Sequence, residues 1–163
     1  MLVPLKLEDW NFNIIKELVI SEYLETDTFE FKPSIKDFDP NNKLTHRILE
    51  TTCAFANTNG GFIIFGIDDM GNKLENRIIG IDKSDDLGKH ISDKIKKIYP
   101  TVYYKFRNPV IKIPNSNKIL FVIQIFQSSE RPHMKTDVGR FYFRTNGGNE
   151  FMTYQQVKEA FLR

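Results

Sequence analysis

The feature that most constrains the fold is an apolar run near the middle of the chain, Phe-Ile-Ile-Phe-Gly-Ile at residues 62–67. An unbroken run of β-branched and aromatic residues predicts a strand that is buried on both faces, in the middle of a sheet. Two glycines precede the run, and Asp68 and Asp69 follow it. The sequence therefore predicts a central strand that ends in carboxylates.

Helices and strands are expected on both sides of this strand. Ser84 is suited to cap a helix, and Thr153 with Gln156 forms a capping box for a short final helix packed through Val157, Ala160 and Phe161. Their mixed order, without a repeating β-α-β ladder, predicts an α+β domain with a mixed β-sheet flanked by helices. The expected helices are at residues 11–23, 43–57, 84–98 and from 154, and the expected strands at 28–32, 62–67, 77–81, 102–106, 119–126 and 140–144.

The length of 163 residues suits one domain. Residues 1–21 are expected to form an N-terminal helical extension, and residues 22–163 the domain itself. Cys53 has no second cysteine to pair with, so we expect it to fill space in the core. The first residues lack the basic and apolar pattern of a signal peptide, and no run approaches the roughly 18 apolar residues of a membrane span, so we expect a cytoplasmic protein without membrane contact.

The net charge of +2 does not by itself indicate a polyanionic partner. Any nucleic-acid surface must therefore come from local clustering of cations, and such clusters occur in the C-terminal half, among strand-like segments with tyrosines. Arginine and lysine bind phosphates, and exposed rings stack on unpaired bases. The alternative is that these strands have an ordinary polar face, with Tyr103 or Tyr104 and Phe141 or Phe143 filling the core. The candidate contacts are Lys105, Arg107, Arg131, His133, Lys135, Arg140 and Arg144, of which His133 could equally be structural.

Glu25, Glu30, Lys32 and Asp68 could converge at one end of the sheet. Carboxylate oxygens bind Mg²⁺ or Mn²⁺, the metal activates water, and a lysine stabilises the charge that develops on a phosphate. The alternative, favoured by spacing alone, is that Glu30 and Lys32 form the solvent face of a strand whose other face is aromatic. Likewise, Asp68 could simply belong to a turn.

The turn after the helix at 43–57 also allows two interpretations. Its glycines are explained by helix capping. Alternatively, the backbone amides of the turn, together with Asn57 and Thr58, could approach a phosphate or orient the nearby carboxylates.

Several motifs in this order resemble the Schlafen-type AlbA_2 domain: Glu30-Phe31-Lys32, residues 54–69, Ile79-Gly80-Ile81, residues 129–133 and residues 139–144. The resemblance covers roughly residues 22–160. It implies a three-carboxylate nuclease site in which Glu25, Glu30 and either Asp68 or Asp69 bind Mg²⁺ or Mn²⁺, with Lys32 beside them. Asp68 is preferred to Asp69 as the third carboxylate.

The resemblance also implies a nucleic-acid partner. Family members cleave structured RNA, whereas many prokaryotic relatives are described only as DNA-binding domains. We therefore expect a divalent-metal-dependent nuclease acting on RNA or single-stranded DNA, and the alternative is a non-catalytic regulatory module that binds DNA or RNA. Vertebrate Schlafen cores have two related lobes, while this chain has the length of one, so it could form a homodimer or act alone. A nucleotide-binding domain is disfavoured because the chain has no Gly-rich Lys-Ser/Thr phosphate loop.

Overall fold

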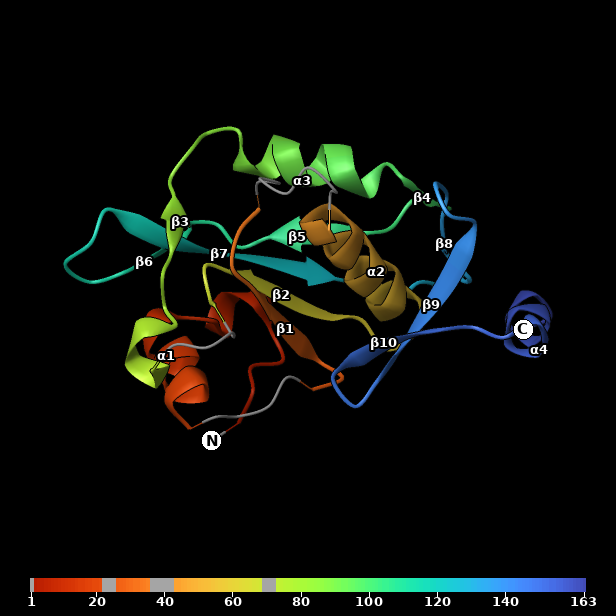
Figure 1. Cartoon of the computed structure of the whole chain (residues 1–163), viewed down its shortest axis with the longest axis horizontal. Coiled ribbons are helices and arrows are strands. Elements are labelled where there is room, and N and C mark those ends of the chain that lie inside the picture. The colour runs from red at the N-terminus through yellow and green to blue at the C-terminus, as the bar shows by residue number, and fades with distance from the viewer. Residues whose placement is uncertain (1, 22–25, 36–42, 69–72) are drawn as a thin grey trace.

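The central strand predicted from the apolar run is β2, Gly61–Phe65, in a computed structural model that describes residues 2–21, 26–35, 43–68 and 73–163. It pairs in parallel with β1 and antiparallel with β7, in a six-stranded sheet (Figure 1). The strands β3, β5 and β6 pair with β7. The bounds of the remaining strands of this sheet are β1 Phe29–Lys32, β3 Ile81–Asp82, β5 Tyr104–Phe106, β6 Ile111–Lys112 and β7 Lys118–Ile125.

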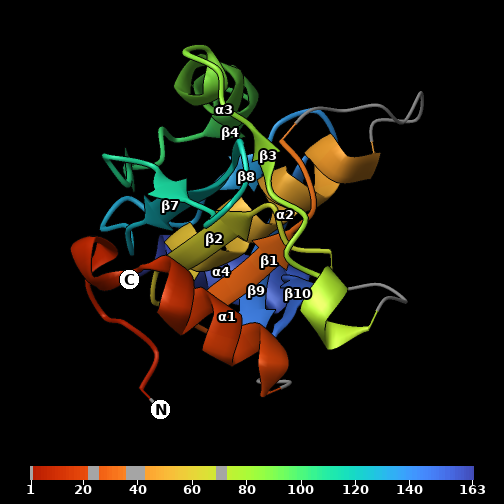
Figure 2. The same cartoon turned by 90° about the vertical axis from the view of Figure 1, so that its left-hand side faces the viewer.

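Alternating side chains of β2 enter two separate hydrophobic cores. Phe62 and Ile64 pack with Trp10 and the helix α1, Phe12–Ile20, on one side of the sheet. Ile63 and Phe65 pack on the other side, towards α2, Lys43–Asn57, and α3, Leu87–Ile95. The helices therefore cover both faces (Figure 2), which explains why this strand carries no polar residue.

A second, four-stranded sheet covers the far side of α2. Its order is β10, Gly148–Phe151, then β9, Arg140–Thr145, β8, Met134–Lys135, and β4, Ile98–Tyr99. The helix α2 contacts both β7 of the first sheet and β9 of the second, and it is buried along most of its length. A helix enclosed in this way forms the centre of a single α+β domain.

The predicted helix at 43–57 is confirmed at both ends, and the strands at 28–32, 62–67, 102–106, 119–126 and 140–144 are confirmed within three residues. The short strand or edge segment expected at residues 77–81 is confirmed only at its end, where β3 begins at Ile81. A 3₁₀ helix, Leu74–Asn76, and one isolated bridge at Ile78 precede β3. The helix expected at 84–98 ends at Ile95, because Ile98 instead pairs with β8. A further 3₁₀ helix spans Leu7–Asp9.

The capping box of Thr153 and Gln156 is confirmed at the start of α4, Tyr154–Phe161. The residues expected to pack this helix are covered only in part: Val157 and Ala160 are half-buried, Phe161 is 65% exposed, and no residue of α4 is fully buried. The helix lies beyond the end of the second sheet (Figure 1). The ring of Phe141 contacts that of Phe161 there. Cys53 is buried as expected. Within the described ranges, no helix combines the length and apolar character that crossing a membrane requires.

Candidate functional site

Glu30 and Lys32 share one face of β1, and that face points into the protein. Phe29 and Phe31 take the other face and pack in the core that contains α1. Glu30 is 5% exposed and Lys32 is 8% exposed, so the interpretation of this pair as a solvent face is wrong. The Lys32 Nζ donates to Glu30 Oε1, which places a carboxylate and an ammonium group side by side in the interior.

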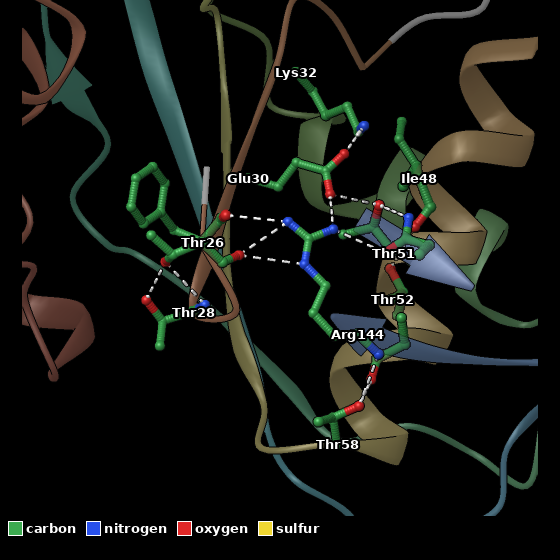
Figure 3. Close-up of polar contacts among 12 residues, drawn as sticks. Thr26, Thr28, Glu30, Lys32, Ile48, Thr51, Thr52, Thr58 and Arg144 are labelled. Atoms are coloured by element: carbon green, nitrogen blue, oxygen red, sulfur yellow. Dashed lines mark hydrogen bonds and ion pairs between the residues drawn. The ribbon is translucent and has the colours of Figure 1, made fainter. Parts of the chain in front are cut away.

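Arg144 reaches this pair from β9 of the second sheet (Figure 3). Its guanidinium is fully buried, and its Nη1 lies 2.5 Å from Glu30 Oε2. It also donates to the backbone oxygens of Thr26, at 3.1 and 3.3 Å, and of Phe29, at 3.3 Å. The ring of Phe55 lies 4.9 Å from the guanidinium carbon. Arg144 therefore satisfies carbonyl groups at β1 and joins the two sheets.

Two uncharged residues complete the network around Glu30. Thr51 of α2 donates from Oγ1 to Glu30 Oε2 at 3.0 Å. Asn149 of β10 donates to Thr51 Oγ1 at 2.9 Å and accepts from Arg144 Nη1 at 2.8 Å. Both carboxylate oxygens of Glu30 are thus engaged within the protein. Neither Thr51 nor Asn149 is predicted from the sequence, because a threonine within a helix and an asparagine after a glycine turn carry no distinctive signal.

Asp68 lies close to the end of β1 because β1 and β2 are parallel. The amides of Gly66 and Ile67 donate to the backbone oxygen of Lys32 at 2.8 and 3.2 Å, and Asp68 is the next residue. The structure thus brings the backbone of Asp68 close to Lys32, at the C-terminal end of β1. Glu25 and Asp69, the other predicted carboxylates, lie outside the described residues.

The described part of the chain does not fit a divalent cation. It contains no group of three or more His, Cys, Asp or Glu side chains able to hold a metal ion. Moreover, the two oxygens of Glu30 already face the cations Lys32 and Arg144. A third positive charge beside them would need further carboxylates. Binding of Mg²⁺ or Mn²⁺ at Glu25, Glu30 and Asp68 therefore stays a prediction.

The turn after α2 connects this helix to the second sheet. The side chain of Asn57 donates from Nδ2 to the backbone oxygens of His133 and Tyr142, at 3.0 and 2.8 Å. Its Oδ1 accepts from the backbone amide of His133 at 2.6 Å. Thr58 Oγ1 accepts from the Arg144 amide at 3.0 Å. Gly60 has a φ of +74°, and a Cβ there would lie 2.7 Å from the Ile125 oxygen. The Gly60 amide donates to the Phe55 oxygen at 2.8 Å, which closes the end of α2 as the capping interpretation predicts. The side chains of Asn57 and Thr58 hold backbone groups of the second sheet.

The predicted nucleic-acid contacts divide between surface and interior. Tyr142 and Arg144 face α2 and are buried, whereas Phe141 and Phe143 are half-buried on the outer face of β9, so the expected orientation of this strand is wrong. Arg107 Nε donates to the backbone oxygen of Trp10 at 2.7 Å. Lys105 and Arg140 are exposed, Arg107 and Arg131 are half-buried, and His133, Lys135 and Arg144 are buried.

His133 is completely buried, and its Nδ1 lies 2.7 Å from the backbone oxygen of Pro100. Because a carbonyl only accepts, Nδ1 carries the proton. Nε2 has no hydrogen-bond partner in the described part of the structure. Burial lowers the pKa of His133, and the Pro100 contact opposes this effect more weakly. Lys135, also buried, lies 2.5 Å from His46 Nδ1 and 3.3 Å from Asp137 Oδ1. Both predicted contacts thus have partners inside the protein.

Comparisons with known proteins agree with this architecture. The family model described as Schlafen, AlbA_2 matches residues 25–153. The N-terminal domain of a protein related to the ATP-dependent DNA helicase RecG, from Nitrosomonas europaea, has a TM-score of 0.56 at 13% identity, over 85% of this chain and 92% of that domain. The DIP2311 protein from Corynebacterium diphtheriae has a TM-score of 0.50 at 20% identity, over 82% of this chain and 23% of that one.

These two identities support a shared fold and nothing finer. The chain spans only 23% of the DIP2311 protein, so an activity of that whole protein cannot be assigned to this chain. None of the curated proteins matches the chain.

Proposed function

Because this chain belongs to the Schlafen AlbA_2 family, whose members have nucleic-acid-related functions, we propose that it binds RNA or single-stranded DNA without cutting it. In this proposal Glu30 is a structural counter-ion that holds Lys32 and Arg144. The exposed cations outside this centre contact the phosphate backbone.

The observation that carries the proposal is that both oxygens of the Glu30 carboxylate already accept from buried donors. One oxygen accepts from Lys32, and the other accepts from Arg144 and Thr51. Three of the roughly four lone pairs of this carboxylate are used, so a metal ion would find only the second lone pair of Oε1, directly beside the Lys32 ammonium, and displacing Lys32 or Arg144 would leave a buried cation without its partner. Removing one partner of a buried ion pair costs about 3–5 kcal/mol. The contacts of the described residues therefore favour a structural role for Glu30 over metal binding.

The binding surface in this proposal consists of cations that remain accessible. Lys105 and Arg140 are exposed and Arg131 is half-buried. Phosphate contacts by such residues release counterions, so affinity falls as salt rises. Removing one contact should reduce the slope of log affinity against log salt by about one. The modest net charge of the chain does not exclude this, since local clusters determine the contacts.

A metal-dependent nuclease is the second candidate, favoured by the parallel pairing of β1 and β2. That pairing brings Asp68 to the end of β1, on the same sheet edge as Lys32. Glu30, Lys32 and Arg144 together carry one net positive charge. Adding Glu25 and Asp68 would change this to one net negative charge, and carboxylate oxygens are the ligands that Mg²⁺ and Mn²⁺ prefer.

One experiment separates the two candidates. Labelled tRNA, single-stranded RNA and single-stranded DNA are incubated with the protein in Mn²⁺, Mg²⁺ or chelator. Anisotropy measures binding, and denaturing gels measure cutting. We expect salt-dependent binding in chelator and intact nucleic acid in every metal. Lys105→Ala should reduce the salt slope, while Lys112→Ala, an exposed lysine outside the set, serves as the charge control.

Two results would overturn the binding-only proposal. Metal-dependent cutting that is lost in both Glu25→Gln and Asp68→Asn, with unchanged thermal unfolding, would establish the nuclease. Absence of binding to all three nucleic acids at low salt would remove both candidates.

A further inference from the structure

A hollow of about 520 Å³ lies where the second sheet meets α4, away from the Glu30 centre. Its volume falls within the roughly 300–1,000 Å³ of small-molecule sites. Residues of β9, β10 and α4 surround it. They are Gly139, Arg140, Phe141, Phe151, Met152, Tyr154 and Val157.

The hollow combines a cation with accessible aromatic rings. The guanidinium carbon of Arg140 lies 4.2 Å from the ring centre of Phe151. Phe151 is 53% exposed and Tyr154 is 83% exposed, although both are large apolar groups. Lys158, also exposed, lies one helical turn after Tyr154 and therefore on the same side of α4. Unpaired bases stack on guanidinium planes and on aromatic rings of this kind.

A smaller hollow of about 210 Å³ lies next to the same helix and shares Met152 with the first. Its lining includes Arg131 and Arg163, together with the single carboxylate of Glu159. Arg131 donates to the Thr58 backbone oxygen at 3.4 Å, which holds the side chain at this place. The α4 surface therefore offers ring faces in one hollow and an excess of positive charge in the other.

We propose that the α4 surface is a binding site for single-stranded nucleic acid, in which an unpaired base stacks on Arg140, Phe151 and Tyr154 and a phosphate contacts Arg131. This inference rests on the proposed nucleic-acid binding and specifies its substrate class. The excess of cations favours a polyanion over an apolar protein partner. Duplexes are poor ligands, because their bases are stacked on each other and cannot enter the hollow.

The test measures the affinity of the whole chain for a single-stranded oligonucleotide of about 12 nucleotides, within the usual site sizes for one domain. A matched oligonucleotide lacks the bases but keeps the backbone. Tyr154→Ala removes a ring, and Arg140→Lys keeps the charge but loses the planar stacking surface. Tyr99→Ala is the control, because Tyr99 is 68% exposed at the opposite edge of the second sheet.

We expect Tyr154→Ala and Arg140→Lys each to weaken binding of the normal oligonucleotide about tenfold. Both should bind the base-free oligonucleotide as the wild type does, and Tyr99→Ala should stay within about twofold on either ligand. Circular dichroism checks that each variant is folded.

Two outcomes would overturn the base-stacking site. One is wild-type affinity in both variants, as expected if α4 instead contacts another protein. The other is an equal loss on the two oligonucleotides, which would indicate a backbone contact alone. Either outcome leaves nucleic-acid binding itself intact, whereas failure of the wild type to bind any nucleic acid removes the proposed function as well.

Discussion

The charge balance around Glu30 predicts an unusual order of stability losses. Glu30→Gln leaves two buried cations, Lys32 and Arg144, without their carboxylate. Arg144→Met removes one cation and leaves Glu30 paired with Lys32. The first substitution should therefore destabilise the protein more than the second, although both break the same ion pair.

The magnitudes follow from the contacts that each substitution removes. Breaking a buried pair costs about 3–5 kcal/mol, and the two unpaired cations place Glu30→Gln at the upper end, about 5 kcal/mol. Arg144→Met loses the ion pair and the hydrogen bonds to Thr26 and Phe29, but the methionine side chain still fills the space beside Phe55. We expect a loss of about 3 kcal/mol.

The double variant Glu30→Gln/Arg144→Met provides the decisive comparison. Removing Arg144 relieves one of the two unpaired charges, so the double variant should be more stable than Glu30→Gln alone. Urea unfolding followed by circular dichroism at pH 7.5 gives all four free energies of unfolding. Additive losses, or a Glu30→Gln variant no less stable than Arg144→Met, would refute the assignment of Glu30 as the shared counter-ion.

Three further predictions concern groups outside this network. Because burial lowers the pKa of His133, the unfolded chain takes up a proton below about pH 6.5 that the folded protein does not, so the free energy of unfolding should fall as pH drops below that value. Urea titrations should show a smaller fall in His133→Asn, and an unchanged pH dependence would contradict this. Burial raises the pKa of Cys53 to about 12, so its thiol should react with Ellman's reagent at pH 8 only after unfolding. Gly60→Ala should lose about 2 kcal/mol in the same urea assay, because of its positive φ and the approach to Ile125.

The sequence predicts this fold well where periodicity and burial coincide. The apolar run of β2 and the helix Lys43–Asn57 are both enclosed on all sides, so their composition reflects their surroundings. Short elements such as β3 and β4 depend on pairing with distant strands, and no local pattern encodes that pairing. The helix α4 has clear capping signals, but a cap specifies where a helix begins and not what it packs against.

The candidate site shows a more specific limit. Alternation along β1 correctly predicts that Glu30 and Lys32 share a face, but it gives no information on whether that face meets water. The answer depends on α2 and on Arg144, which lies 114 residues from Glu30 in the sequence. A period-2 pattern with charges on one face has the same appearance whether the charges face solvent or a buried arginine.

The strand β9 contributes both to the buried Glu30 network and to the proposed base site. Arg140, Tyr142 and Arg144 alternate along β9 and so share the face that α2 covers. Arg144 and Tyr142 lie beneath this helix and pair with Asn149 and Phe151 of β10. At the end of the strand Arg140 is exposed and stacks on Phe151 instead. The ring of Phe151 also contacts Tyr142, so a continuous series of side-chain contacts runs from the strand face beneath α2 to the surface arginine of the proposed base site.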